Sequence, residues 1–380
     1  MRGVLLLRVA QKAVSSSGIQ SNFQSSSKRC WCLFSNQLHS HAPSSFGIAF
    51  DIDGVLLRGS IPISGSSHAL RRLYDNFGTI RVPFVFLTNG GGVPEYERAR
   101  ELTSLLRINI LPSQVLQGHT PFKHLVKRFE NEFIVAVGKG EPAKVMSEYG
   151  FRNVLSMDEY ASFFENIDPL AQYKEFADKQ IVSHQKVTLR QDPCSERVQA
   201  VFIVSDSIDW CRDIQVLCDI LRTGGLPGRE VAHQPPIFFA NDDLAYQALF
   251  PSERLGMGAF RVALESIYNS IHQKPLEYTS YGKPNPFVFK NAEATLMQLQ
   301  LPHQAATGGM HSFKTLYMVG DNPSVDINGA RQAGPPWFSI LTRTGVFKGR
   351  VNESDFSADL VVDTVEDAVE YILSRERYSS

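Results

Sequence analysis

Two aspartates stand two residues apart at the end of a short apolar run. The run Phe46–Phe50 reads Phe-Gly-Ile-Ala-Phe, and Asp51, Ile52, Asp53 and Gly54 follow it. An apolar stretch of this length predicts a central parallel strand whose carboxyl end opens onto a ligand crevice. Two carboxylates so close repel each other unless a cation accompanies them, and oxygen ligands at a strand end suit Mg²⁺ better than zinc.

A carboxylate can also act as a nucleophile. In aspartyl-phosphate chemistry one aspartate attacks phosphorus, and a second acid protonates the leaving oxygen and later deprotonates water. On this chain those roles fall to Asp51 and Asp53. The letters Asp-x-Asp-Gly also occur in calcium loops and ordinary turns, so the assignment depends on what lies downstream.

A second predicted strand ends in a hydroxyl and an amide. Arg81–Leu87 reads as a buried strand, and Thr88 and Asn89 follow it, with the glycines Gly90–Gly92 directly behind. A hydroxyl and flexible backbone amides at a strand end make a phosphate cradle. An ordinary glycine turn explains the same letters equally well.

A third predicted strand also ends in acid. Thr315–Val319 leads into Gly320 and Asp321, and Asp326 follows five residues later. A lone Lys283 precedes this strand in the chain. Because all carboxyl ends of a parallel sheet lie at one edge, the fold should bring these groups together with the earlier aspartates.

Strand and helix signals alternate along the rest of the chain, which predicts an α/β fold. Helices are predicted over Ser66–Phe77, Pro94–Leu106, Pro112–Phe129, Pro142–Tyr149, Trp210–Leu221, Ala259–Ile271 and Glu366–Leu373. Further strands are predicted over Phe133–Val137, Val198–Val204, Ile237–Ala240, Trp337–Leu341 and Asp359–Val362. The polar run Met157–Glu196 has no clear period and is predicted to be a peripheral insertion.

These signals predict a discontinuous domain with a second unit inserted in it. We expect a Rossmann-like parallel-sheet core over residues 46–130 and 277–380, and an inserted α/β unit over residues 131–276. The inserted unit is the only large element available to read a substrate beyond its reacting group.

The first 45 residues have the composition of an organelle transit peptide. They contain no Asp or Glu, and they combine five basic residues with many serines. This pattern favours the mitochondrial matrix, with a plastid as the alternative, although a disordered basic tail has the same composition. Without those five residues the 38 basic residues fall to 33 against 39 acidic ones, a net charge of −6, which does not indicate nucleic-acid binding.

The apolar runs and the cysteines argue against a membrane span, a zinc site and a disulfide framework. The longest aliphatic run near the start, Val4–Leu7, is far shorter than a membrane span, so no transmembrane helix is expected. Cys30 and Cys32 lie in the leader and form only one Cys-x-Cys pair, which argues against a zinc site. The other three cysteines have no paired spacing, which argues for a reducing compartment.

The four polar stretches, in this order, resemble the motifs of the haloacid dehalogenase superfamily of hydrolases. The resemblance runs from Phe46 to about Val362, and it rests on Asp51-Ile52-Asp53-Gly54-Val55, Thr88-Asn89, Gly282-Lys283-Pro284 and Gly320-Asp321 through Asp326-Ile327. It implies an aspartate-nucleophile phosphatase that acts on a small phosphorylated metabolite. In such an enzyme Asp51 attacks phosphorus, Asp53 is the acid/base, and the phosphate is held by Thr88, Asn89 and Lys283.

The resemblance also implies a cofactor. Mg²⁺ would be bound by the carboxylates of Asp51 and Asp321 and by the backbone carbonyl of Asp53, and Asp326 would orient metal-bound water or Lys283. One departure stands out, because the second motif is followed by three glycines instead of a further polar residue. One phosphate contact is then missing or made by backbone. A homodimer is left open.

An insertion between the second and third motifs resembles the subclass of nitrophenyl-phosphate, phosphoglycolate and pyridoxal-phosphate phosphatases. Three stretches look closer still to the cat-eye-syndrome-critical-region branch, namely Ile208–Trp210, Ala240–Leu244 and Leu255–Phe260. That branch is largely mitochondrial. Some of its fungal relatives are fused to a CDP-alcohol phosphatidyltransferase, which hints at glycerophospholipid metabolism.

Other interpretations remain open on the sequence alone. A haloalkanoate dehalogenase would not need an acid at the position of Asp53, so this residue favours phosphoryl transfer. A phosphomutase is one alternative, and a catalytically idle binding protein that docks to a lipid-synthesis enzyme is another. Asn241–Asp243 either read substrate or begin a helix before Leu244. His119 and His233 have no ligand partners nearby in sequence and are predicted to be structural.

Overall fold

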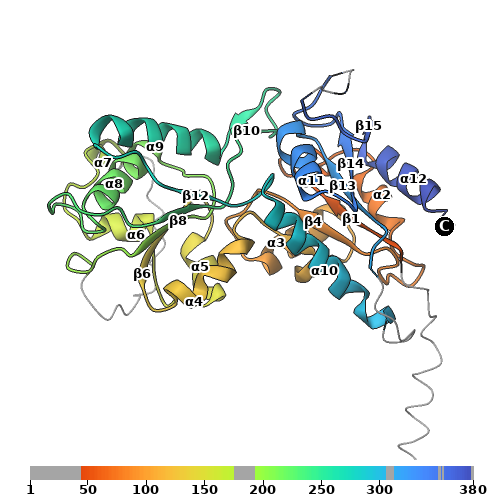
Figure 1. Cartoon of the computed structure of the whole chain (residues 1–380), viewed down its shortest axis with the longest axis horizontal. Helices are drawn as coiled ribbons and strands as arrows, with labels where there is room; N and C mark the ends of the chain where they lie inside the picture. Colours follow the sequence, from red (N-terminus) through yellow and green to blue (C-terminus); the bar gives the residue numbers. More distant parts are fainter. Residues whose placement is uncertain (1–43, 175–192, 305–311, 350–351, 353–354, 378–380) are drawn as a thin grey trace, which may run out of the picture. The chain divides into compact units, whose positions relative to one another are not determined.

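The computed structural model describes residues 44–174, 193–304, 312–349, 352 and 355–377 (Figure 1). The predicted leader lies outside the described residues except for Ser44 and Ser45, and so do Cys30 and Cys32. None of the helices in the described part of the chain has the length and apolar character needed to cross a bilayer.

The first sheet is parallel throughout and has the strand order β15-β14-β13-β1-β4-β5. Its strands are β1 (Phe46–Phe50), β4 (Phe84–Leu87), β5 (Val115–Leu116), β13 (Thr315–Gly320), β14 (Trp337–Thr342) and β15 (Leu360–Val362). The register places Phe50 beside Val319 on one side and beside Phe86 on the other. The strands that precede the three predicted polar stretches are therefore direct neighbours in a parallel sheet, and the parallel sheet is the fold that the sequence predicts.

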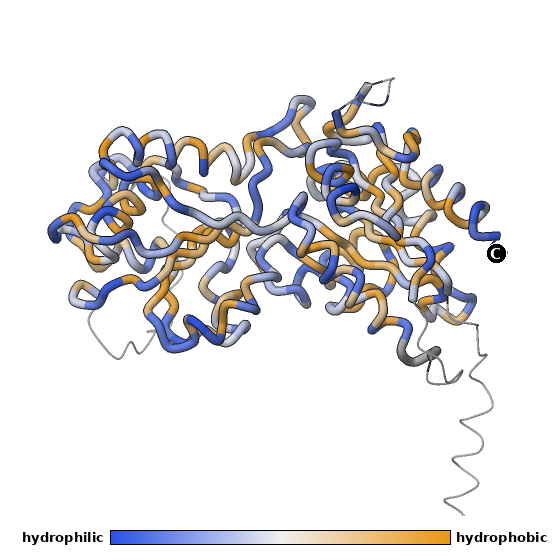
Figure 2. Tube along the Cα trace, viewed as in Figure 1, coloured by the Kyte–Doolittle hydropathy of each residue, from blue (hydrophilic) through white to orange (hydrophobic). Residues whose placement is uncertain are grey.

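Helices cover both faces of this sheet because its strands are apolar on both faces. Ile48 and Phe50 of β1 pack with the side chains of α2 (Ser66–Arg71), α3 (Glu95–Leu106) and α12 (Val365–Arg375). Ala49, between them, packs on the opposite face with α10 (Pro286–Gln304) and α11 (Asn328–Ala333). The hydropathy colouring shows the apolar strands enclosed in this way (Figure 2).

The second sheet is also parallel, with the order β12-β9-β8-β6-β7. Its strands are β6 (Phe133–Val137), β7 (Asn153–Ser156), β8 (Ala200–Ile203), β9 (Ile237–Phe239) and β12 (Thr279–Ser280). The helices between and after them are α5 (Pro142–Tyr149), α6 (Met157–Ser162), α7 (Ala171–Lys174), α8 (Trp210–Arg222) and α9 (Met257–Ile271). Because β12 pairs with β9, this sheet extends four residues beyond residue 276, where we expected the insertion to end.

Two short antiparallel hairpins complete the described elements. They are β2 (Leu57–Arg58) with β3 (Ile61–Pro62), and β10 (Ala245–Tyr246) with β11 (Arg254–Leu255). The hairpins approach each other, since a Cβ built on Gly59 would lie 2.7 Å from Cγ of Leu249. A side chain at position 59 would therefore displace the Leu249 side chain.

The prediction of a single helix over Pro112–Phe129 is wrong. The segment contains 3₁₀ turns at Pro112–Gln114 and Thr120–Leu125, the strand β5, and only one turn of helix, α4 (Val126–Phe129). Gly118 interrupts it where the backbone passes the end of β4, and a Cβ there would lie 2.7 Å from the Asn89 carbonyl oxygen. The helix predicted over Ser66–Phe77 is also shorter, since α2 ends at Arg71.

Candidate active site

The carboxyl ends of β1, β4 and β13 place the predicted site residues at one edge of the first sheet. Asp51 follows β1 directly, and its backbone N–H donates to the Val319 carbonyl at 2.9 Å. One carboxylate oxygen each from Asp51, Asp321 and Asp326 lie within 4.8 Å of one another, and all three residues are buried. The parallel register thus brings together groups that are 275 residues apart in sequence.

Lys283 joins two of these carboxylates. Its Nζ donates to Oδ1 of Asp51 at 2.7 Å and to Oδ1 of Asp326 at 2.6 Å. Burial opposes the charge of Lys283, but Asp326 and Asp51 raise its pKa above the usual value. The remaining oxygen of Asp326 accepts the backbone N–H groups of Asp321 and Asn322 at 3.1 and 3.0 Å. Asp326 therefore holds Lys283 and the loop after β13 in place.

One ammonium group does not balance the buried acid. Burial raises the pKa of Asp51 well above its usual value, an effect that Lys283 partly offsets and that Asp326 and Asp321 reinforce. Burial and then Asp326 raise the pKa of Asp321 to about 8. Like charges held this close disfavour ionisation of one another. The cluster therefore favours an added cation.

Two glycines explain how the backbone can approach Asp321 so closely. Oδ2 of Asp321 accepts the Val346 N–H at 2.6 Å. A Cβ on Gly54, which has φ of +89°, would lie 2.3 Å from that oxygen, and one on Gly345 would lie 1.8 Å from it. The glycine of the Asp-x-Asp-Gly stretch is thus required both by its left-handed backbone and by this contact.

Asp53 lies in the same cavity but has a different environment. Its carboxylate has no hydrogen-bond partner among the described residues, and a Cβ on Gly90 would lie 3.3 Å from its Oδ2 and 3.2 Å from Oγ1 of Thr88. Burial raises the pKa of Asp53, and Arg98 and Lys139 partly offset that rise. A carboxyl group with a raised pKa and no fixed partner is suited to proton transfer.

The side chain of Asn89 is already fully engaged by protein groups. Its Oδ1 accepts the Lys283 N–H at 2.8 Å, and its Nδ2 donates to the Lys283 carbonyl at 3.0 Å and to Oδ1 of Asp243 at 2.8 Å. The amide of Asn241 donates to the Asn89 carbonyl at 2.8 Å. Asn89 thus fixes the backbone of Lys283, and it is itself fixed by the segment that follows β9.

Asp243, for which the sequence left open a role in reading substrate or in starting a helix, lines the same cavity. The alternative of a helix beginning before Leu244 is wrong, because Leu244 precedes the strand β10. Burial raises the pKa of Asp243 to about 7, although Lys283 and Asn89 act in the opposite direction. No local signal identifies the partner of Asp243, since Asn89 lies 154 residues away.

This raised pKa predicts a pH-dependent effect of Asp243→Asn. A carboxyl group with a raised folded pKa stabilises the fold below its unfolded pKa, near 3.8, and that contribution is lost as the pH rises through about 7. The amide keeps the acceptor for Asn89 without a charge to bury. In urea unfolding at pH 8.5, we expect the free energy of unfolding of the variant to exceed that of the wild type by about 1–4 kcal/mol. At pH 4 the two should differ little. An equal change at both pH values would contradict this explanation.

The cavity over these residues has a volume of about 380 Å³ and is lined from both sheets. The groups described above line one side together with Arg98 of α3 and Gln117, which follows β5. The other side is formed by Lys139 and Asp206, which follow β6 and β8, and by Tyr246 of β10 and Met257 of α9. Lys139 and Asp206 are ion-paired at 2.7 Å.

His119 and His233, which the sequence predicts to be structural, do not line this cavity. Nδ1 of His119 lies 2.7 Å from the hydroxyl of Tyr149, which donates to Oε1 of Glu95 at 2.7 Å. Burial lowers the pKa of His119 to about 4. The ring of His119 is therefore neutral at physiological pH and fills the junction between α3 and α5. His233 is exposed at the surface.

Two family models match the chain. The haloacid dehalogenase-like hydrolase model matches residues 48–152, and the HAD-hydrolase-like model matches residues 280–368. The first match contains Asp51, Asp53, Thr88 and Asn89, and the second contains Lys283 together with the acid after β13. The two matches therefore cover the residues that meet at the edge of the first sheet.

Two curated relatives span most of this chain. A mitochondrial hydrolase of Saccharomyces cerevisiae is 32% identical over 347 residues, which are 86% of this chain and 95% of the relative. A Schizosaccharomyces pombe protein described as a cardiolipin synthase (CMP-forming) and mitochondrial hydrolase fusion is 31% identical over 333 residues. The match covers 86% of this chain and about half of the fusion protein, 53%.

Solved structures share the fold at low sequence identity. A possible sugar phosphatase from Cytophaga hutchinsonii has a TM-score of 0.59 and 15% identity, with 85% of this chain and 94% of that chain covered. A glycerol phosphate phosphatase of Mycobacterium tuberculosis, solved with calcium, has a TM-score of 0.52 and 17% identity, with 84% and 73% covered. The family matches and the full-length yeast relative establish that this chain belongs to the haloacid dehalogenase-like hydrolases.

Proposed function

We propose that this hydrolase is a Mg²⁺-dependent phosphatase that cleaves a small phosphate monoester through an aspartyl-phosphate intermediate. The observation that carries the proposal is the position of Asp51, whose carboxylate lies at the end of β1, 2.7 Å from Nζ of Lys283 and grouped with Asp321 and Asp326. A buried carboxylate beside a fixed cation can approach a dianionic phosphoryl group that it would otherwise repel.

In the first step a carboxylate oxygen of Asp51 forms a bond to phosphorus while the bond from phosphorus to the ester oxygen breaks. Asp53 gives its proton to the departing oxygen, so the alcohol leaves uncharged. The ammonium of Lys283 and the hydroxyl of Thr88 donate to phosphoryl oxygens. Oγ1 of Thr88 accepts the Gly90 N–H at 3.0 Å and donates to no acceptor among the described residues, so its hydrogen is available.

In the second step water attacks the phosphorus of the aspartyl phosphate. Asp53, now ionised, takes a proton from this water, and the bond between phosphorus and Asp51 breaks. The products are inorganic phosphate and the original carboxylate of Asp51. Asn89 would contribute its backbone N–H to the phosphate instead of its engaged side chain, because that N–H has no acceptor among the described residues.

The donor set fits a magnesium ion. Among the described residues, one carboxylate oxygen of Asp51 and one of Asp321 accept no hydrogen bond. The backbone carbonyl oxygen of Asp53 accepts none either. Oxygen donors of this kind suit Mg²⁺, whose charge would offset the excess of buried acid. Once bound, the ion would neutralise phosphoryl oxygens in the transition state. Both oxygens of Asp326 are engaged, so Asp326 would orient Lys283 instead of binding the ion.

Phosphate release tests this function. With millimolar Mg²⁺ we expect hydrolysis of small phosphate monoesters across a metabolite panel, and we expect EDTA to abolish it and added Mg²⁺ to restore it. Mg²⁺ should also raise the melting temperature of the wild type but not of Asp321→Asn, which gives a readout besides activity. No hydrolysis across the panel would instead favour a catalytically idle protein. Return of the phosphoryl group to a second hydroxyl of the product would identify a phosphomutase.

We further propose that residues 131–280 form a cap that reads the leaving group of the substrate. The residues around Lys283 can bind a phosphoryl group, yet the far wall of the cavity comes from Lys139, Asp206 and Tyr246 of this segment. The Asn89–Asp243 contact ties the segment to the catalytic edge. Enclosure by such a cap would exclude water during transfer.

We also propose a mitochondrial location and a substrate connected to glycerophospholipid metabolism. The acid-free, serine-rich leader supports the first proposal, as do the names of the two fungal relatives. The fusion of one relative to a cardiolipin synthase supports the second. A fusion of residues 1–45 to a fluorescent protein should reach mitochondria, and cytosolic fluorescence would contradict the targeting proposal.

A further inference from the structure

A second cavity, of about 270 Å³, adjoins the catalytic one. The two cavities lie side by side, because five residues line both of them, namely Lys139, Asp206, Tyr246, Gly256 and Met257. The remaining wall of the second cavity is formed mainly by apolar side chains, namely Ile208, Trp210, Leu255 and Phe260. A group that enters the catalytic cavity therefore has an apolar space directly beyond the Lys139–Asp206 ion pair.

Two of these apolar side chains are strongly exposed. Ile208 is 74% exposed and Leu255 is 65% exposed, although both line a concave site. Leu255 is paired with Ala245 across the β10–β11 hairpin, and Ala245 lines the catalytic cavity. Large apolar side chains exposed beside a catalytic cavity are typical of a surface that a ligand covers.

Two aromatic rings form the floor of the second cavity, and Phe260 is buried while Trp210 is partly buried. The rings of Trp210 and Phe260 meet edge to face with their centroids 5.5 Å apart. Met257, at the start of α9, lies next to them and lines both cavities. Thioether and aromatic groups adapt to apolar ligands of varied shape without leaving a buried polar group unpaired.

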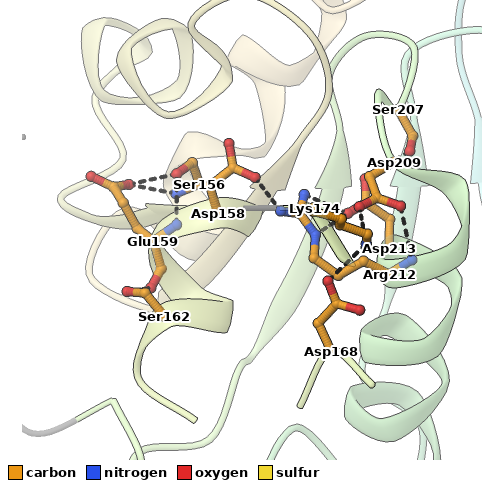
Figure 3. Close-up of polar contacts among 10 residues, drawn as sticks. All are labelled: Ser156, Asp158, Glu159, Ser162, Asp168, Lys174, Ser207, Asp209, Arg212 and Asp213. Carbon is orange, nitrogen blue, oxygen red and sulfur yellow. Dashed lines mark hydrogen bonds and ion pairs between the residues drawn. The ribbon is translucent and has the colours of Figure 1, made fainter. Parts of the chain in front are cut away.

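A network of polar contacts holds the segment that carries Ile208 (Figure 3). Ser207 donates to Oδ2 of Asp213 at 2.7 Å, and the side chain of Asp209 caps α8 by accepting the Arg212 N–H at 3.2 Å. Lys174 also contacts Asp209, and Arg212 pairs with Asp213 at 2.8 Å. The residues on both sides of Ile208 are thus anchored, which fixes this wall before a ligand arrives.

We propose that the second cavity holds an apolar part of the alcohol that is released on hydrolysis, so that the substrate is an amphiphilic phosphate monoester. This inference rests on the proposed phosphatase function, and it names the class of substrate. The Lys139–Asp206 pair lies where a substrate would pass from its phosphate to its apolar end, and it can hydrogen-bond a hydroxyl or ester oxygen there. The apolar part is an alkyl chain or an aromatic ring.

Straight-chain alkyl phosphates test the inference because their leaving groups have nearly the same basicity. Differences in kcat/KM along the series from ethyl to octyl phosphate therefore report binding of the chain. Burial of each methylene should raise kcat/KM by about fourfold until the cavity is full. Benzyl phosphate distinguishes an aromatic ring from a chain, since a site shaped for rings will prefer it to hexyl phosphate.

Two variants and a matched control locate the effect. Ile208→Asn and Leu255→Asn should each reduce the ratio of kcat/KM for hexyl phosphate to that for ethyl phosphate by about tenfold, since polar groups would replace the apolar wall. Val231→Asn is the control, because Val231 is 65% exposed but lines neither cavity. Its ratio should equal that of the wild type. All three side chains are exposed, so the variants should fold, which thermal unfolding checks.

The outcomes separate this inference from the function on which it rests. A rising series that is flattened by Ile208→Asn and Leu255→Asn, but not by the control, supports the apolar subsite. A flat series with clear hydrolysis of ethyl phosphate overturns the subsite and leaves the phosphatase intact. A rising series that Val231→Asn flattens equally also overturns it, because the effect would then not be local. Absence of hydrolysis from the whole series overturns both.

Discussion

Replacement of Asp51 by asparagine is expected to reduce phosphate release by about 10⁴-fold or more. An amide cannot form the acyl phosphate, so the proposed route loses its nucleophile. The substitution also removes one carboxylate from the proposed Mg²⁺ site. The measurement is kcat/KM for a small phosphate monoester at saturating Mg²⁺. Retention of more than about a tenth of the wild-type rate would show that Asp51 is not the nucleophile.

The same variant should leave the fold intact, which separates a chemical effect from unfolding. An asparagine oxygen can still accept from Nζ of Lys283, as Oδ1 of Asp51 does at 2.7 Å. Burial raises the pKa of Asp51, so removal of its charge should not lower the free energy of unfolding in the absence of Mg²⁺. Asp363→Asn is the matched control, because Asp363 is a surface aspartate paired only with Arg343 among the described residues. That variant should keep wild-type activity.

The positions of the carboxylates in the candidate site could be predicted because the information is local. An apolar run that ends in Asp51 specifies a buried strand, and the carboxyl ends of parallel strands share one edge. The same reasoning applies to Thr88 after β4 and to Asp321 after β13, and the observed register brings these strands together. Gly54 also follows from this arrangement, since the backbone must turn beside Asp321.

The contacts of the segment after β9 could not be predicted because they depend on tertiary structure. Asp243 and Asn241 form an unremarkable polar cluster in sequence, and only the fold shows that both contact Asn89. The engagement of Asn89 with Lys283 is equally non-local. The sequence predicts a helix where the strand β5 forms. This strand has only two residues, too few to show an alternating apolar pattern, and its stability comes from pairing with β4.

The proposed apolar subsite also depends on tertiary structure and could not be predicted from the sequence. Ile208 and Leu255 are 47 residues apart in sequence, and no local pattern links them. Their common position beside Met257 results from the packing of α8 and α9 on the second sheet. Sequence periodicity indicates which face of an element is buried, but it does not indicate which exposed residues of separate segments lie together.

Replacement of Asp53 by asparagine should lower the rate by about 10²–10⁴-fold for a substrate with a poor leaving group. Asp53 has no hydrogen-bond partner among the described residues, and burial raises its pKa, so its proposed role is proton transfer to the leaving oxygen. 4-Nitrophenolate leaves without a proton, so formation of the aspartyl phosphate from 4-nitrophenyl phosphate should be slowed far less. Burst kinetics in a rapid-mixing experiment measure that step separately from hydrolysis of the intermediate.

The second half of the reaction gives Asp53→Asn an independent readout. Because an amide at position 53 cannot deprotonate water, the variant should accumulate phosphorylated Asp51, which intact-protein mass spectrometry detects as an added phosphoryl group. Asp206→Asn is the control, since Asp206 lines the same cavity but is paired with Lys139. The Asp206→Asn variant should change KM more than it changes the rate of the burst phase. Equal losses on good and poor leaving groups, with no trapped intermediate, would rule out acid/base catalysis by Asp53.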